Sequence, residues 1–143
     1  MNLKDLYINY ILYGNVKGKD VVLLHGWGQN IEMMDPIGKG LSKNFHITIL
    51  DLPGFGKSSE PPYGYTVYDY YEVLCELLDK LKIKNPILVG HSFGGRISII
   101  YSAKNEVEKV VLLAAPFKRS TKKNSFKVKL LKFMKKELKI MKR

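Results

Sequence analysis

The sequence is short of cysteine: its 143 residues include one, Cys75, so no disulfide can form within the chain. Disulfides belong mainly to proteins of oxidising compartments, and a single thiol fits a reducing one. The opening residues 1–5 lack the charged-then-apolar pattern of a signal peptide. No apolar run approaches the length of a membrane span. We therefore predict a cytoplasmic protein.

Residues 1–116 also lack a net charge, although the whole chain carries a formal charge of +11. They hold twelve basic and twelve acidic residues, whereas residues 117–143 hold twelve basic residues and one acidic residue. A charge confined to one end gives no reason to expect a nucleic-acid surface over the body. We expect no specific nucleic-acid partner, and we treat 1–116 and 117–143 as two separate parts.

Strands and helices are predicted to alternate along residues 1–116. Apolar or β-branched runs predict strands at 6–13, 21–24, 45–50, 86–89 and 109–115. Helical spacing of apolar residues predicts helices at 31–43, 66–81 and 93–104, the second opened by a capping box at Thr66 and Asp69. Uniformly apolar strands between helices indicate an α/β fold with a mostly parallel sheet covered on both faces. The first strand is expected at an edge, antiparallel to its neighbour.

The hexapeptide 90–95, Gly-His-Ser-Phe-Gly-Gly, lies between a predicted strand and a predicted helix. Strand, G-x-S-x-G and helix together are the context of a nucleophile elbow, in which Ser92 stands clear of the sheet on a sharp turn. Gly90 and Gly94 then allow the neighbouring backbone to approach without a Cβ in the way. The plainer alternative is that Ser92 is only a small residue in a tight turn.

Three loops are expected at the carboxyl ends of parallel strands, where sites form in such sheets. They are His-Gly-Trp-Gly at 25–28, Asp-Leu-Pro-Gly-Phe-Gly-Lys-Ser at 51–58, and the elbow. In order and spacing these motifs resemble the α/β-hydrolase superfamily, and the resemblance runs from about residue 6 to residue 116.

The resemblance implies a role for each motif. Ser92 would be the nucleophile, and the backbone N–H groups of Trp27 and Phe93 would form the oxyanion hole. His25 would be structural, and the 51–58 loop would shape the pocket floor. The loop residues expected to support the site are His25, Gly26, Gly90 and Gly94. No metal or organic cofactor is implied.

The residues after Ser92 depart from the family pattern, which supplies an acid and then a histidine. No histidine and no aspartate follows Ser92, and the three histidines are His25, His46 and His91. Neither His25 nor His91 is expected to act as the base, since both belong to loop motifs. Glu106 and Glu108 begin a predicted strand, at the opposite end of the sheet from the loops. The triad is thus incomplete, and we expect that a working enzyme needs a second polypeptide carrying the Asp and the His.

These motifs lead to one expected function for the protein and to two alternatives. The sequence looks like the truncated N-terminal portion of a serine hydrolase acting on an ester or similar small acyl substrate, with 117–143 as a basic, helical, incomplete cap. The alternatives are a catalytically inactive fragment of a split gene, and a membrane- or anion-associated module that uses the basic tail, either as a surface helix or as a disordered segment. A P-loop is not expected, because the motif needs glycine at position 51.

Overall fold

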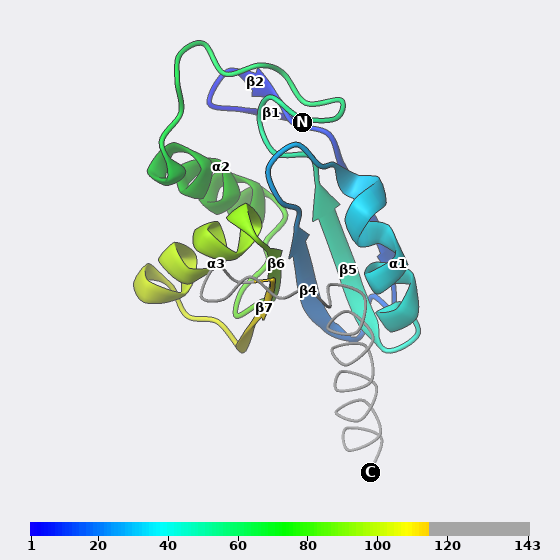
Figure 1. The fold of residues 1–143 in the computed structure, drawn as a ribbon. Coiled ribbons are helices and arrows are strands. Elements are labelled where there is room, and N and C mark those ends of the chain that lie inside the picture. Colours follow the sequence, from blue (N-terminus) through cyan, green and yellow to red (C-terminus); the bar gives the residue numbers. More distant parts are fainter. Residues whose placement is uncertain (115–143) are drawn as a thin grey trace.

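The computed structural model describes residues 1–114. Within that range a sheet is flanked by helices on both faces (Figure 1). The elements are, in chain order, β1 (Asn2–Leu3), β2 (Leu6–Tyr7), β3 (Tyr10–Gly14), β4 (Lys19–Leu24), α1 (Ile31–Leu41), β5 (Phe45–Leu50), α2 (Val67–Lys80), β6 (Ile87–His91), α3 (Phe93–Lys104) and β7 (Lys109–Leu113).

The main sheet has the strand order β3-β5-β4-β6-β7 over the described residues. β5, β4, β6 and β7 run parallel to one another, and β3 pairs antiparallel with β5. This confirms the predicted mostly parallel sheet with an antiparallel first strand at one edge. Because the four parallel strands share a direction, the loops that follow them emerge at one edge of the sheet.

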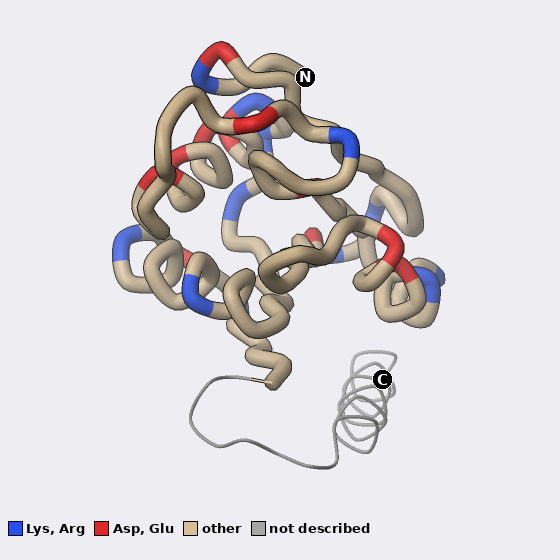
Figure 2. Tube along the Cα trace, turned by 45° about the horizontal axis from the view of Figure 1, so that its top comes forward, with Lys and Arg blue, Asp and Glu red and all other residues tan. Residues whose placement is uncertain are grey.

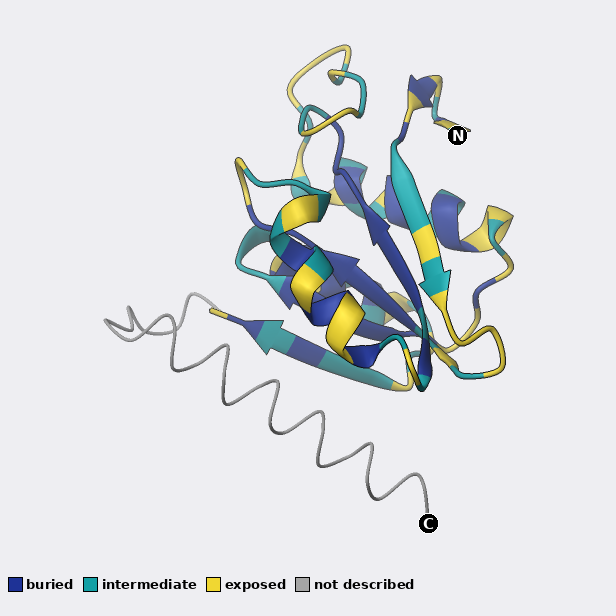
Figure 3. Ribbon diagram, turned by 90° about the vertical axis from the view of Figure 1, so that its right-hand side faces the viewer, coloured by how far each residue is buried: buried dark blue, intermediate teal, exposed yellow. Residues whose placement is uncertain are grey.

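The two faces of the sheet are buried by different helices. Along β4, Val22 and Leu24 belong to the core beneath α2 and α3, whereas Val21 and Leu23 belong to the core beneath α1. Successive side chains of a strand point to opposite faces, so a strand covered on both sides must be apolar throughout. The central strands are accordingly buried along almost their whole length (Figure 3).

The prediction of a single strand over 6–13 was wrong, because the structure divides this stretch at Ile8 and Asn9. β1 and β2 form a small hairpin whose turn residues, Lys4 and Asp5, have φ values of 49° and 63°. Such a two-residue turn with both φ positive matches the twist of the strands it joins. The Asn9 N–H donates to Ser58 Oγ at 2.9 Å, and the Asn9 carbonyl accepts the Asp51 N–H at 2.8 Å. These bonds to the 51–58 loop take Asn9 out of the sheet.

Helix α1 forms despite a proline and two glycines that make its sequence a poor helix former. Met34, Ile37 and Leu41 are buried against the sheet, as the apolar spacing predicts. Packing explains why residue 38 is a glycine, since a Cβ there would collide with the Tyr13 hydroxyl and would lie 3.0 Å from Ile47. Close approach of the helix to the sheet therefore outweighs low helix propensity.

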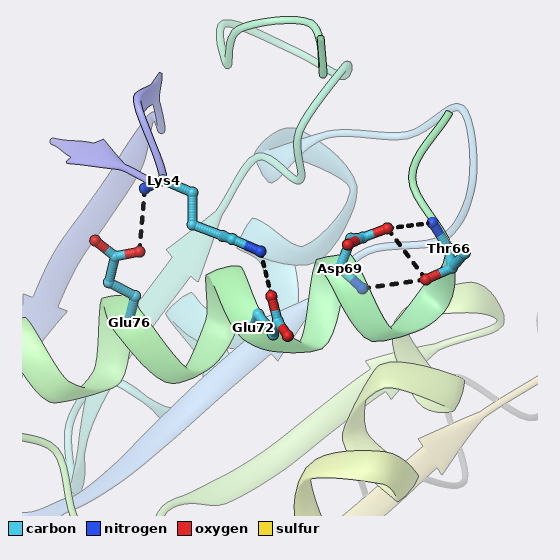
Figure 4. Close-up of polar contacts among 5 residues, drawn as sticks. All are labelled: Lys4, Thr66, Asp69, Glu72 and Glu76. Atoms are coloured by element: carbon cyan, nitrogen blue, oxygen red, sulfur yellow. Dashed lines mark hydrogen bonds and ion pairs between the residues drawn. The ribbon is translucent and has the colours of Figure 1, made fainter. Parts of the chain in front are cut away.

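Helix α2 begins as the sequence predicts, with the capping box of Thr66 and Asp69 (Figure 4). The β1–β2 hairpin is held against this helix by Lys4, whose backbone N–H donates to Glu76 at 3.1 Å and whose ammonium group pairs with Glu72. The N-terminal hairpin is thus tied to the middle of the chain.

The remaining boundaries follow the sequence closely, and β7 ends at Leu113. The prediction that this strand continues through Ala114 was wrong, because Ala114 leaves the extended conformation with a φ of 48°. Residue 115 and the basic tail 117–143 lie outside the described residues. Over the described chain, lysines, arginines and carboxylates are intermingled (Figure 2). No helix among residues 1–114 is long and apolar enough to cross a membrane.

Candidate active site

Loops from three neighbouring strands meet at one edge of the sheet. β4 is followed by residues 25–30, β5 by residues 51–58, and β6 by the turn at Ser92. Leu24 pairs with Leu50 on one side and with Gly90 on the other, so the three strands end at the same level. Segments far apart in the sequence thereby form one surface.

Ser92 occupies a backbone conformation that side-chain-bearing residues rarely adopt, with φ 52° and ψ −110°. Such conformations cost about 1–3 kcal/mol and persist only where the surroundings impose them. Here the Ser92 N–H donates to the Leu113 carbonyl of β7 at 2.9 Å, and the Ser92 carbonyl accepts the Gly95 N–H at 2.9 Å. The Ser92 side chain does not cap helix α3. This is the strained strand-to-helix turn that the sequence motif predicts.

The glycines around Ser92 fill positions where a Cβ would meet backbone. At Gly90 it would lie 2.5 Å from the Gly94 carbonyl oxygen and 2.6 Å from the Gly95 Cα. At Gly94 it would collide with the carbonyl groups of Leu24 and His25. Helix α3 therefore starts in direct contact with the end of β4.

The backbone N–H groups of Trp27 and Phe93 have no acceptor within residues 1–114. Phe93 opens helix α3, where the first N–H groups have no partner inside the helix and the helix dipole favours negative charge. Trp27 lies in a turn closed by a 3.1 Å bond from the Gln29 N–H to the Gly26 carbonyl. Gly28 has φ +78°, as the third residue of a type II turn requires.

His25 joins the 25–30 loop to the 51–58 loop from a fully buried position. Its Nδ1 lies 2.7 Å from the Gly26 carbonyl oxygen, so Nδ1 carries the proton, and its Nε2 accepts the Leu52 N–H at 2.9 Å. Burial lowers the pKa of His25. Both ring nitrogens of this neutral imidazole are therefore engaged in holding loops together.

The carboxylate of Asp51 is engaged in the same way. It accepts the Ile31 N–H at 2.8 Å, the Lys57 N–H at 3.0 Å and the Asn9 side-chain amide at 2.9 Å. A Cβ on Gly56 would collide with it. The glycine-rich stretch 54–58 thus wraps a carboxylate of its own chain, which a phosphate-binding loop does not do.

The side chains of Trp27 and Phe93 belong to an aromatic cluster. The Trp27 ring meets Phe55 and Phe93 edge to face, at centroid distances of 4.8 and 5.3 Å, and Tyr70 lies 5.1 Å from Phe93. Trp27 remains 64% exposed. The contact between Trp27 and Phe93 brings together the two residues that the resemblance assigns to an oxyanion hole.

The two acids after Ser92 that the structure describes, Glu106 and Glu108, lie away from this surface, as expected. Glu137 lies outside the described residues. Glu108 precedes β7 and pairs with Lys19, the first residue of β4, at 2.6 Å. That is the opposite end of the parallel strands from Ser92. Glu106 is exposed in the loop before it. The described residues contain no group of three or more ligand-type side chains that could hold a metal ion.

Cys75 lies on α2, half-buried, in the wall of a hollow of about 470 Å³. The lining also includes Tyr101 of α3 and Asn105, the residue that follows α3. Burial raises the pKa of its thiol, which disfavours the reactive thiolate. This hollow is separate from the Ser92 edge.

Gln29 is the site residue that the motifs did not single out. Its side-chain oxygen lies 2.9 Å from the Gly26 nitrogen and 2.9 Å from His91 Nδ1, so it contacts both the Trp27 turn and the elbow. The sequence feature that could have pointed to Gln29 is a polar side chain three residues after Gly26, at the end of the turn.

Fold and site together define a protein of the α/β-hydrolase class, in which a serine follows a central parallel strand. The chain belongs to the family described as alpha/beta hydrolase fold, whose model matches residues 20–138. This confirms the family that the three motifs indicate.

Its relatives have hydrolase names. The chain is 33% identical over 118 residues to a "Probable serine hydrolase" of Drosophila melanogaster, covering 78% of this chain and 36% of that protein. It is 34% identical over 100 residues to a pimeloyl-[acyl-carrier protein] methyl ester esterase of Pseudoalteromonas atlantica, covering 68% and 37%. The crystal structure of a membrane phospholipase A matches with a TM-score of 0.75 at 30% identity, covering 78% and 37%. The chain thus spans little more than a third of the length of these proteins.

Proposed function

We propose that this chain supplies the nucleophile and the oxyanion hole of a serine hydrolase acting on an ester or similar small acyl substrate. The observation that carries the proposal is the strained turn at Ser92, together with the N–H groups of Trp27 and Phe93, which have no acceptor among residues 1–114. Relatives named as an esterase and as a lipase support an acyl substrate.

In this mechanism the Ser92 oxygen attacks the acyl carbonyl carbon. The carbonyl oxygen becomes an oxyanion, and the N–H groups of Trp27 and Phe93 donate hydrogen bonds to it. The proton of Ser92 passes to a histidine, which returns it to the leaving alcohol, and water then releases the acyl group by the same steps. Gly26, Gly90 and Gly94 support the site by permitting its close contacts, and His25 by holding the turn.

The histidine and its acid partner lie outside the printed sequence in this proposal. His25 is engaged on both ring nitrogens, and no histidine follows Ser92. A second polypeptide that carries the Asp and the His would complete the triad. Without the base, Ser92 is a weak nucleophile, and activity falls by several orders of magnitude. The competing hypothesis is a catalytically inactive fragment.

A fluorophosphonate probe tests the proposal in two arms. One arm uses the 143-residue chain alone, and the other uses the chain produced together with the protein encoded directly after it. We expect labelling of Ser92 in the second arm, and labelling at least about a thousandfold slower in the first because the base is missing. Ser92→Ala abolishes the label. Ser102→Ala, which removes another α3 serine, leaves it unchanged. Absence of Ser92 labelling from both arms would overturn the proposal in favour of the inactive fragment.

The basic tail supports a second candidate function, peripheral contact with an anionic membrane surface. The net charge of the chain resides in residues 117–143. Location in the cytoplasm is likewise a prediction from the sequence.

A further inference from the structure

The Gln29 side chain contacts its own turn and also His91, which is 62 residues away in the sequence. Its Oε1 is 2.9 Å from the Gly26 backbone nitrogen, on the turn that carries Trp27. The same oxygen is 2.9 Å from Nδ1 of His91, the residue before Ser92. One atom therefore contacts both loops that the proposed oxyanion hole requires.

Hydrogen-bond chemistry determines the orientation of these groups. A backbone N–H can only donate, so the Gln29 atom that faces Gly26 must be the carbonyl oxygen. His91 Nδ1 then has to donate to that oxygen, which accepts two bonds through its two lone pairs. His91 consequently carries a proton on Nδ1.

Gln29 also closes the turn through its backbone. Its N–H donates to the Gly26 carbonyl at 3.1 Å, and the buried His25 ring donates to the same carbonyl at 2.7 Å. Both polar groups of Gly26 are thus held, one by the side chain of Gln29 and one by its main chain. Trp27, the next residue, is fixed at the corner of the turn.

A side chain at Gly26 would crowd the contact between the turn and the elbow. A Cβ on Gly26 would lie 2.9 Å from His91 Nδ1 and 3.0 Å from Gln29 Oε1.

We propose that Gln29 is a positioning residue that fixes the Trp27 N–H relative to the Phe93 N–H, and so pre-organises the oxyanion hole; this rests on the proposed function. An oxyanion forms only in the transition state, so a hole with displaced donors lowers kcat more than it changes KM. Removing one donor outright typically costs about 10²–10³ in kcat, and a displaced donor should cost less.

The first test uses the complete enzyme, the chain together with the polypeptide that supplies the base, and p-nitrophenyl acetate as substrate. We expect Gln29→Leu to lower kcat by about 10- to 100-fold while KM changes less than about threefold. Gln29→Glu, whose carboxylate can accept both bonds, should restore most of kcat. A purely structural role would instead lower the amount of folded enzyme and leave kcat per folded molecule unchanged.

The second test needs no activity and uses the printed chain. ¹⁵N NMR shifts of the His91 ring report which nitrogen is protonated, and hydrogen exchange reports protection of the Gly26 N–H. We expect Nδ1 protonation and a protected Gly26 in the wild type and in Gln29→Glu, and loss of both in Gln29→Leu. Asn30→Ala removes the neighbouring α1 cap and should change neither signal.

The two tests separate the possible failures. An unchanged His91 tautomer and unchanged Gly26 exchange in Gln29→Leu would overturn the proposal, as would altered signals with unaltered kcat. A wild-type enzyme without esterase activity would overturn the proposed function, and with it the catalytic purpose of Gln29. The NMR signals would still decide whether Gln29 holds the turn to the elbow.

Discussion

At the scale of single residues, His25 shows how a polar group is kept inside the protein. It is fully buried, donates from Nδ1 and accepts at Nε2, and so satisfies both nitrogens only as the neutral Nδ1–H tautomer. A second proton on Nε2 would face the Leu52 N–H and break that bond. Burial accordingly lowers the pKa of His25 below its ordinary value of 6.5.

This arrangement predicts loss of stability in mild acid. Above pH 6.5 His25 is neutral in the folded and in the unfolded protein. Below pH 6.5 the unfolded chain binds a proton at His25 that the folded chain does not bind. The free energy of unfolding should therefore fall as the pH drops below 6.5, by at most about 1.4 kcal/mol per pH unit from this one group. Urea unfolding monitored through Trp27 at a series of pH values measures it.

The matched variants are His25→Gln and His46→Gln. His25→Gln lowers stability at neutral pH, since buried partners lose their bonds at a cost of about 1–3 kcal/mol, and it flattens the acid-side slope. His46 pairs with Asp20 toward the opposite end of the sheet, and its removal should leave the His25 slope in place. An acid-side slope unchanged in His25→Gln would refute the assignment.

At the scale of elements, the contact of helix α3 with the end of β4 depends on Gly94. This glycine lies in the first turn of the helix, where a Cβ would meet the carbonyl groups of Leu24 and His25. Backbone cannot move aside as a flexible side chain can. The helix and the Ser92 turn can take this place only with glycine at 94.

Gly94→Ala should therefore destabilise the protein, although alanine favours helices by about 1 kcal/mol over glycine. We expect a loss of about 2 kcal/mol or more in the free energy of unfolding, because the added methyl group forces helix and strand apart. Gly64→Ala is the control, since no atom lies within 4 Å of its Cβ position, and a change within about 0.5 kcal/mol is expected. Stabilisation by Gly94→Ala would show that α3 does not pack as described.

At the scale of the whole molecule, charge divides the chain into a neutral body and a strongly basic end. Residues of both signs are intermingled along the described chain (Figure 2), while residues 117–143 account for the entire formal excess of +11. Attraction of the chain to an anionic surface should therefore depend on those residues and weaken with salt.

Vesicle sedimentation with phosphatidylserine tests this division on the full chain. Replacing four tail lysines by glutamine should weaken binding at low salt by at least about 100-fold, at about 1 kcal/mol per charge. Replacing four exposed body lysines should have little effect. The tail set is Lys118, Lys122, Lys123 and Lys127, and the body set is Lys17, Lys43, Lys57 and Lys84. Equal effects of the two sets, or binding indifferent to salt, would contradict a role of the tail.

Local pattern alone determined much of this protein. Three features depend on residues a few positions apart and can be predicted from the sequence. They are the order of strands and helices, the capping box at Thr66 and the turn at Ser92. The same holds for the family, because the motifs at 25–28, 51–58 and 90–95 are short and contiguous.

Other features of the protein depend on contacts between segments that are distant in the sequence. The 6–13 stretch has the composition of one strand, yet bonds from Asn9 to Ser58 and Asp51 divide it. In the sequence Gln29 is an ordinary loop residue. Its role depends on the fold, which brings His91 Nδ1 within 2.9 Å of Gln29 Oε1. Propensity and spacing describe neighbours along the chain, whereas these hydrogen bonds join groups 42 to 62 residues apart. Only the packed sheet, which ends β4, β5 and β6 at one level, brings such groups within bonding distance.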